Sequence, residues 1–315
     1  MGVDTGRLEP DRIPRTRHCS LAWLPDGSGF YYTRHPEPGS VAPGEEFYHR
    51  RVYFHRLGDD PTLDPMVFGA ERPVHELPHV VVSDDGRYVM VLAHQGWRST
   101  EVFLFDRHDP ERGWLPLLTG YDARFDGCLL DGRVYLLTNW QAPYGRIVAV
   151  DPADPRPEAW QEIVPASDAL VLREFVPAGG HLLVMGLSDA VSRLFLVPRK
   201  GGAMREVALP GSGTATHLSG SSRAGVAVAC FESFALAPRI LRIDPTTGTA
   251  STWLTSRSAV KDDDVLVERT YATSRDGTRV PLFVLRARDA KGSGARPTVL
   301  TGYGGFNVAR TPQYD

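Results

Sequence analysis

The stretch Gly302-Tyr303-Gly304-Gly305-Phe306-Asn307 is the part of the sequence whose residue types and spacing most clearly suggest chemistry. It follows the apolar residues 297–301 directly. A strand that runs into a glycine-rich turn is how α/β domains begin a loop that faces a ligand. The glycines start like the GxGxxG loop of dinucleotide-binding proteins, but Asn307 stands where the third glycine is required. The pattern therefore favours a ligand-facing loop and argues against a dinucleotide; we expect no cofactor.

A second motif, His75-Glu76-Leu77-Pro78-His79, matches the HExxH sequence of zinc peptidases. That chemistry requires a helix, because only a helix brings both histidines onto one face at positions i and i+4. Pro78 lies inside the required turn, and proline disfavours a helix interior by about 3 kcal/mol. The motif also runs straight into Val80-Val81-Val82, which is typical of a strand. We therefore predict a strand here and no metal site.

The segment Gly186-Leu187-Ser188-Asp189-Ala190 resembles a nucleophile elbow, with alanine in place of the last glycine. An elbow joins a strand to a helix, whereas the residues after Ala190 continue into another apolar strand, so Ser188 is predicted to be a turn serine. All ten histidines lie at or before His217. A Ser-His-Asp triad needs a base within hydrogen-bond reach of its nucleophile, so the last 55 residues, 261–315, cannot supply a triad by themselves.

The bulk composition excludes several classes of protein. The chain has 35 Lys and Arg against 38 Asp and Glu, a net charge of -3, and no basic stripe, so nucleic acid is a poor candidate partner. Cys19, Cys128 and Cys230 form no CxxC pair, which favours a reducing compartment over a disulfide framework. The first 18 residues contain no apolar signal segment, and no apolar run approaches the length of a membrane span. We expect a cytoplasmic protein that does not enter membranes.

A repeat organises the first 250 residues. Short apolar strands begin at residues 52, 102, 147, 194 and 240, with spacings of 50, 45, 47 and 46 residues. Each has an earlier β-rich strand upstream that follows a turn, such as Asp26-Gly27, Asp85-Gly86 or Asp131-Gly132. Asp-Gly accommodates the positive φ of a tight hairpin. A unit of 45 to 50 residues with room for four strands has the size of a propeller blade. A mainly β fold, a β-propeller with five visible blades, is predicted; the alternative is a β-sandwich with fortuitous spacing.

The pattern ends after Gly248, and the last residues have a different character. We place the boundary so that residues 1–260 form an incomplete propeller and residues 261–315 begin a second domain. In the second part we expect a hairpin of residues 265–271 and 280–286 around Asp276-Gly277, then an exposed loop. The apolar residues Pro297 to Thr301 are predicted to form a short strand leading to the glycine-rich stretch.

The block Thr301 to Asn307, after Pro297-Thr298-Val299-Leu300, closely resembles the prolyl oligopeptidase family of serine peptidases. The segment Ser274 to Pro281 looks like the first hairpin of that family's hydrolase domain. Ala22 to Gly27 with residues 30–32, and residues 77–88, look like parts of its propeller. The resemblance runs from about Asp4 to the end, and the Gly-Tyr-Gly-Gly-Phe-Asn block is its specific part. Thr301 replaces the tyrosine usual at that position.

This resemblance implies a seven-bladed propeller stacked on an α/β-hydrolase domain. Residues 1–260 would supply about five blades, and residues 261–315 the first strands of the hydrolase domain. About two blades and an N-terminal hydrolase segment would precede Met1, and the nucleophilic serine, the aspartate and the histidine would follow Asp315. The implied activity is a serine-type endopeptidase that cleaves short peptides after proline, with the propeller restricting substrate size. The implied partner is a short proline-containing peptide, and the complete protein is expected to be a monomer.

The resemblance also carries residue roles. Tyr303 matches the tyrosine whose hydroxyl donates to the oxyanion of the tetrahedral intermediate, and a fixed O–H aimed at developing negative charge stabilises a transition state. Phe306 matches an aromatic wall of the proline pocket. Gly304, Gly305 and Asn307 would complete the substrate-binding loop, because glycine lets the backbone approach closely. The alternative for Tyr303 is a packing residue at the end of a strand.

Two other functions remain to be weighed. A related basic-residue-specific oligopeptidase is disfavoured by Gly305-Phe306-Asn307, because that relative usually has a different string after Gly-Tyr-Gly. A non-catalytic propeller that acts as a binding module is disfavoured by the hydrolase-like tail, since a scaffold has no use for a glycine-rich oxyanion loop.

Residues 1–315 produced as an isolated chain are predicted to be poorly soluble or inactive, because an incomplete propeller and an unpaired strand at 297–301 expose edges that invite aggregation. Size-exclusion chromatography and thermal unfolding test this expectation. A monodisperse monomer that unfolds cooperatively would contradict it.

Overall fold

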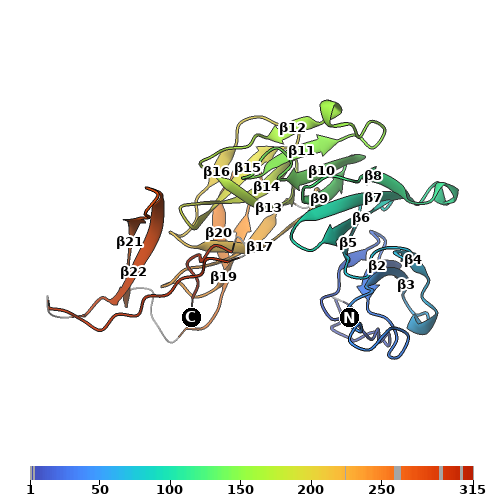
Figure 1. Cartoon of the computed structure of the whole chain (residues 1–315), viewed down its shortest axis with the longest axis horizontal. Helices are drawn as coiled ribbons and strands as arrows, with labels where there is room; N and C mark the ends of the chain where they lie inside the picture. The colour runs from blue at the N-terminus through green and yellow to red at the C-terminus, as the bar shows by residue number, and fades with distance from the viewer. Residues whose placement is uncertain are drawn as a thin grey trace. The chain divides into compact units, whose positions relative to one another are not determined.

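A computed structural model describes residues 2, 4–223, 225–258, 264–290, 294–305 and 308–314. This part of the chain contains 22 β-strands and three short 3-10 helices, labelled in Figure 1. Among these residues no helix is long and apolar enough to cross a bilayer. The chain divides into two compact units, residues 1–162 and 163–315, each described by itself below.

The first unit holds three sheets of four antiparallel strands, which we call blades 1 to 3. Blade 1 contains β1 (Leu21–Trp23), β2 (Gly29–Arg34), β3 (Arg51–Arg56) and β4 (Met66–Phe68), with η1 (Pro61–Leu63) before the last strand. Blade 2 contains β5 (Leu77–Val82), β6 (Tyr88–Gln95), β7 (Ser99–Asp106) and β8 (Leu115–Leu118), with η2 (Pro110–Arg112). Blade 3 contains β9 (Phe125–Leu130), β10 (Arg133–Thr138), β11 (Arg146–Val150) and β12 (Gln161–Val164), with η3 (Pro157–Ala159); β12 crosses the boundary between the units.

The second unit holds blades 4 and 5 and a separate hairpin. Blade 4 contains β13 (Val171–Ala178), β14 (His181–Ser188), β15 (Val191–Pro198) and β16 (Arg205–Val207). Blade 5 contains β17 (Thr214–Gly220), β18 (Ala227–Glu232), β19 (Arg239–Ile243) and β20 (Ala250–Thr255). The hairpin consists of β21 (Val265–Thr273) and β22 (Arg279–Ala287). The five predicted repeats are thus confirmed as five four-stranded meanders, the building block of a propeller.

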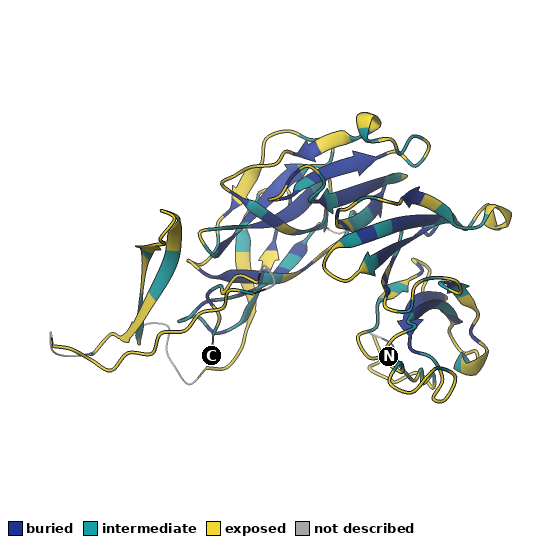
Figure 2. Cartoon of the chain, viewed as in Figure 1, coloured by how far each residue is buried: buried dark blue, intermediate teal, exposed yellow. Residues whose placement is uncertain are grey.

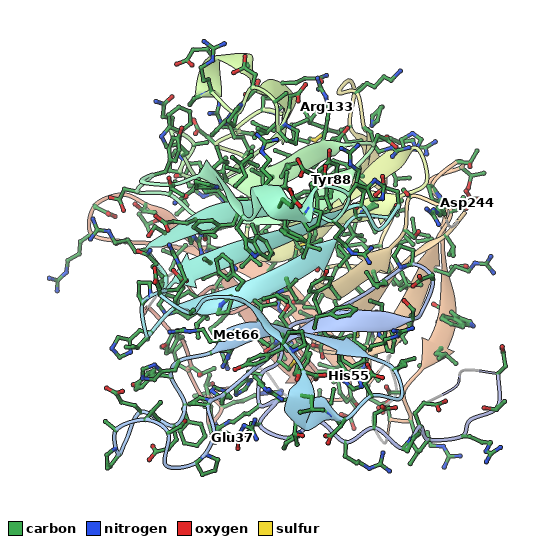
Figure 3. The ribbon with its side chains drawn as sticks, turned by 90° about the vertical axis from the view of Figure 1, so that its right-hand side faces the viewer. Glu37, His55, Met66, Tyr88, Arg133 and Asp244 are labelled. Carbon is green, nitrogen blue, oxygen red and sulfur yellow. The ribbon has the colours of Figure 1, made fainter. Side chains whose placement is uncertain are left out.

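Aspartates at the ends of strands explain why the turns recur. The side chain of Asp85 accepts a hydrogen bond from the backbone N–H of Arg87 at 3.0 Å, and Gly86 between them has a φ of 73°. Asp244, labelled in Figure 3, accepts in the same way from the N–H of Thr246 at 2.7 Å. A short carboxylate that bonds the backbone two residues on stabilises a turn locally. The turn chemistry expected from Asp-Gly is therefore present in the structure.

The core consists of aliphatic faces packed between neighbouring blades. Val89, Val91 and Ala93 of β6 point to blade 1, and each is 0% exposed. The alternate residues Met90 and Leu92 point to blade 3 and are buried equally deeply. Blades 4 and 5 pack in the same manner through a cluster that includes Leu183, Leu194, Phe231 and Leu241. Figure 2 shows the middle strands of the blades as buried and the outer ends of the sheets as exposed. Each fully buried aliphatic side chain contributes about 1.5–3 kcal/mol.

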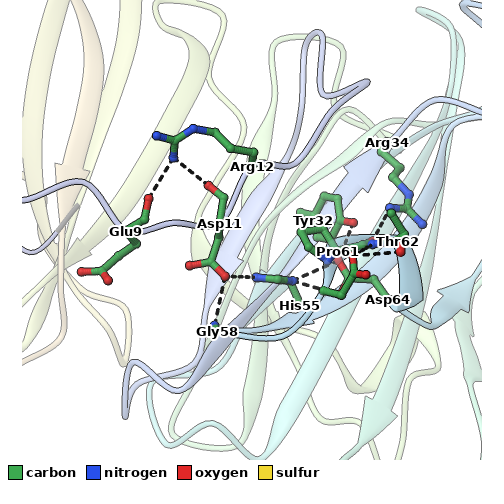
Figure 4. Close-up of polar contacts among 11 residues, drawn as sticks. Glu9, Asp11, Arg12, Tyr32, Arg34, His55, Gly58, Pro61, Thr62 and Asp64 are labelled. Atoms are coloured by element: carbon green, nitrogen blue, oxygen red, sulfur yellow. Dashed lines mark hydrogen bonds and ion pairs between the residues drawn. The ribbon is translucent and has the colours of Figure 1, made fainter.

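Blade 1 also buries a polar network centred on His55, which is 0% exposed (Figure 4). Its Nδ1 lies 2.9 Å from Asp64 Oδ1, and its Nε2 lies 3.2 Å from Asp11 Oδ1. Tyr32 donates its hydroxyl to Asp64 at 2.8 Å, and the N–H of Gly58 donates to Asp11 at 3.0 Å. Both ring nitrogens can donate to these carboxylates when the imidazole carries two protons. The network therefore fastens the N-terminal segment, through Asp11, to the third strand of the blade.

The hydrogen bonds of this network shift the pKa values of Asp11 and Tyr32. Burial opposes the charge on Asp11, but the Gly58 N–H and the His55 ring outweigh it and hold the pKa of Asp11 below its ordinary value. Burial, together with the hydrogen bond to Asp64, raises the pKa of Tyr32. The tyrosine thus stays protonated and donates its hydrogen bond to Asp64 throughout the ordinary pH range.

Substitution of His55 by alanine is expected to lower the free energy of unfolding by about 3–5 kcal/mol, because Asp64 and Asp11 would lose the group that stands between them. Urea unfolding of the protein expressed from its complete reading frame measures this. His108→Ala, at an exposed position, serves as the control and should change stability by about 0.5 kcal/mol or less. Equal losses in the two variants would contradict a stabilising role for the network.

Stability is expected to fall as the pH falls below about 4. The hydroxyl of Ser83 and the N–H of Arg87 hold the pKa of Asp85 below its ordinary value of 3.8. A carboxyl with a depressed pKa stabilises the fold above its unfolded pKa and loses that contribution as it is protonated in the fold. Urea midpoints at pH 6 and pH 3 should therefore differ less in Asp85→Asn than in the parent protein. An unchanged pH dependence in the variant would contradict the assignment.

Candidate active site

The candidate site begins with the β21–β22 hairpin, whose strands pair in register from Val265↔Ala287 to Thr273↔Arg279. Its turn closes through the N–H of Ser274, which donates to the carbonyl of Thr278 at 2.9 Å, and Gly277 has a φ of 86°. The hairpin predicted around Asp276-Gly277 is thus confirmed.

The hairpin is tied to blades 4 and 5 at two points. Tyr271 of β21 donates its hydroxyl to Asp189 at 2.8 Å, and this bond raises the pKa of Tyr271. The ring of Phe283 in β22 lies 5.4 Å from that of Phe234, which follows β18. Asp189 and Phe234 both occupy connections between the second and third strands of their blades, so the hairpin lies at that end of blades 4 and 5.

The strand predicted for Pro297 to Thr301 is wrong. This segment forms no strand, as Figure 1 shows, and Val299 and Leu300 are 91% and 84% exposed. A strand forms only where a neighbour satisfies its backbone N–H and C=O groups. None of the strands in the described ranges pairs with this segment. An apolar pattern alone does not make a strand, and among the described residues no strand pairs with this segment.

Tyr303 lies on the exposed segment that follows, with 54% of its surface accessible. The carbonyl of Gly305 accepts the N–H of Val308 at 3.1 Å. A Cβ on Gly305 would lie 3.4 Å from the hydroxyl oxygen of Tyr303, so the phenol folds back over this glycine. Gly304 is exposed. Tyr303, Gly304 and Gly305 therefore lie together, whereas Phe306 and Asn307 lie outside the described residues.

This arrangement offers one hydroxyl donor on an accessible, glycine-flanked segment. No histidine follows His217 in the sequence, so this segment contains no imidazole base of its own. Across the residues whose positions are described, no three His, Cys, Asp or Glu side chains converge as a metal site.

The two other motifs have structural explanations. Leu77–Val82 is strand β5, so the HExxH segment is not helical; His75 packs against the ring of Tyr48 at 4.4 Å, and Glu76 accepts from Arg72 at 2.9 Å. Ser188 ends β14 and pairs with Val191, the first residue of β15. The two residues between them have positive φ values of 50° and 61°, which is the geometry of a tight hairpin. The turn assigned to Ser188 is confirmed.

Two residues that hold the segment beyond the glycines were not predicted from the sequence. Thr214 and Glu232 of blade 5 hydrogen-bond the backbone at Pro312 and Tyr314, just beyond the glycine-rich turn. These partners are 98 and 82 residues apart in sequence, and neither belongs to a motif. The one feature that brings them together is the pairing of β17 with β18, in which Thr214 and Glu232 are directly opposed. Predicting that pairing residue by residue would have been needed to find them.

Comparison with known proteins identifies the family to which this fold belongs. Residues 1–256 match the sequence model of the prolyl oligopeptidase N-terminal β-propeller domain. The chain is 28% identical over its whole length to a prolyl endopeptidase of Elizabethkingia meningoseptica, covering 44% of that protein. It is 25% identical to prolyl oligopeptidase A of Galerina marginata, with 98% of this chain and 44% of that protein aligned. The chain thus spans less than half the length of these curated relatives.

Solved structures agree in fold. One, from a structural and mechanistic analysis of two prolyl endopeptidases, superposes with a TM-score of 0.89 at 32% identity and covers 99% of this chain and 46% of that chain. The apo form of prolyl oligopeptidase B from Galerina marginata superposes with a TM-score of 0.76 at 19% identity, covering 94% and 42% of the two chains. The chain therefore belongs to the prolyl oligopeptidase family and carries its N-terminal β-propeller domain.

Proposed function

We propose that the protein containing this chain is a serine-type endopeptidase that hydrolyses short peptides on the carboxyl side of proline. The chain itself would supply the propeller that limits substrate size and one catalytic group, the hydroxyl of Tyr303. The nucleophile, base and acid would come from the remainder of the hydrolase domain.

The observation that carries this proposal is the position of Tyr303. Its side chain is accessible, and it is flanked by glycines that leave space for another backbone to approach. Attack on a peptide carbonyl creates negative charge on its oxygen, and a phenol held in place can donate to that oxygen. A merely structural tyrosine at the end of a strand would be packed against its neighbours, whereas this segment forms no strand.

The peptide class follows from the family rather than from the geometry of the chain. The relatives named above are prolyl endopeptidases and oligopeptidases. Phe306, as an aromatic wall, and Asn307, Gly304 and Gly305, as the adjoining backbone, remain our proposed contacts for the proline residue. A flat apolar ring suits a pyrrolidine ring.

The Tyr303→Phe substitution tests the proposed role. In protein expressed from the complete reading frame, we expect kcat for a short chromogenic peptide with proline before the cut to fall about 10²–10³-fold, as it does when one oxyanion donor is removed. KM should change little, because the oxyanion exists only in the transition state. Stopped-assay kinetics over a range of substrate concentrations separate the two constants.

The control is Tyr144→Phe, which removes the hydroxyl of another partly exposed tyrosine, in blade 3. It should leave kcat unchanged. The same peptide with arginine before the cut distinguishes a basic-residue-specific oligopeptidase. A folded full-length protein that cleaves neither peptide would refute the peptidase proposal and favour a binding module.

A further inference from the structure

The segment after the glycine-rich turn changes abruptly from exposed to buried. Residues 308–310 are exposed, Thr311 is half-buried, and Pro312 is buried. Gln313 is exposed again and Tyr314 is half-buried. This alternation is typical of an extended chain with one face against a surface. The covered face lies on blade 5, through Thr214 and Glu232.

Two hydrogen bonds hold this segment. Thr214 donates its hydroxyl to the carbonyl of Pro312 at 2.6 Å, and the pair is buried. The N–H of Tyr314 donates to the carboxylate of Glu232 at 3.1 Å. Proline has no N–H, so its carbonyl is the only backbone group at that position that needs a partner. The carbonyl of one residue and the N–H of the residue two further on face the same side of an extended chain, which lets two adjacent side chains hold both.

The two holding residues occupy one rung of a β-ladder. Thr214 begins β17, Glu232 ends β18, and they are directly opposed in the register of the two strands. Opposed residues of antiparallel strands lie about 4.5–5.5 Å apart. The separation of the donor and the acceptor is therefore fixed by the sheet rather than by flexible loops. We call Thr214 and Glu232 the rung pair.

Neighbouring contacts make the rung pair rigid. The N–H of Ser192 donates to the carbonyl of Gly213 at 2.9 Å, and the Ser192 hydroxyl accepts the N–H of Ala215 at 2.9 Å. Thr214 is thus fixed on both sides by one buried serine of blade 4. A Cβ at Gly213 would lie 2.3 Å from the carbonyl oxygen of Glu232, so only glycine lets the strands approach this closely here.

We infer that the rung pair positions the catalytic segment: by fastening Thr311 to Tyr314 on blade 5, Thr214 and Glu232 set the location of the segment that carries Tyr303. This inference rests on the proposed function, because it assigns the rung pair to the same site. Thr214 and Glu232 are positioning residues; neither touches the reacting atoms. The propeller would then contribute to the rate of the reaction as well as to the selection of substrate size.

The first experiment measures kinetics in protein from the complete reading frame. Thr214→Val keeps the shape of the side chain but removes the donor, which leaves the buried Pro312 carbonyl unpaired. We expect kcat to fall by about tenfold with little change in KM, because the oxyanion donor is misplaced while the substrate still binds. Thr214→Ser, which keeps the hydroxyl, should restore kcat. Glu232→Ala should behave like Thr214→Val, and Glu232→Gln, which keeps an acceptor oxygen, like the parent.

The matched control is Thr138→Val in blade 3. Thr138 is likewise a buried threonine at the end of a strand, and its hydroxyl accepts the N–H of Trp140 at 3.0 Å. This control loses the same group without touching the tail. If Thr138→Val lowers kcat as much as Thr214→Val, the effect is one of general stability and the positioning role is refuted.

The second experiment does not require activity. Hydrogen exchange of peptides that cover residues 308–314 should be about tenfold faster in Thr214→Val and Glu232→Ala than in the parent, because a lost buried hydrogen bond releases the segment locally. Exchange should not change in Thr138→Val. Unaltered exchange in both rung-pair variants would overturn the inference. If the full-length protein is inert but exchange rises, the proposed function fails while the fastening of the tail stands.

Discussion

Burial of both faces of the middle strands is the constraint on which the blades depend. In β6, alternate residues enter two different cores, with Val89 and Val91 on one side and Met90 and Leu92 on the other. A strand buried on both faces has a continuous run of apolar residues, and exposing either face to water would lower the stability of its blade. Each blade is therefore stable only when it lies between neighbours. The repeat has a period of 45 to 50 residues because one blade requires four strands and three turns.

The polar groups inside this framework are placed where apolar packing ends. His55, Asp64 and Tyr32 form a network in blade 1 on the face opposite the one that packs against blade 2. Asp11 closes the network from the N-terminal segment. Buried charges are tolerated only when each has partners. Here the network fixes the position of the N-terminal segment, whose described residues before Leu21 form no strand.

The sequence predicted the features that are periodic or local, and it did not predict contacts between residues that are far apart in the chain. The blade repeat and the turns at Asp85-Gly86 and Asp276-Gly277 were predictable, because hydrophobic period and turn chemistry are written in adjacent residues. The strand at Pro297 to Thr301 was predicted and does not form, because pairing depends on a neighbour that local pattern cannot supply. The His55 network could not be predicted, since its members are spread from residue 11 to residue 64 without a motif. Within the candidate site, Tyr303 was found by resemblance, and the rung pair was not found at all.

The rung pair connects the regular packing of the blades with the irregular segment that contains the candidate site. Ala215 and Phe231 form the next rung of the same ladder, and both belong to the buried core between blades 4 and 5. The spacing of Thr214 and Glu232 is therefore set by aliphatic packing one residue away. A substitution that widens this core would move the two hydrogen bonds to Pro312 and Tyr314 before it touched the candidate site itself. In this way the packing that stabilises the propeller also fixes the chain that leads to Tyr303, although the tyrosine itself makes few contacts.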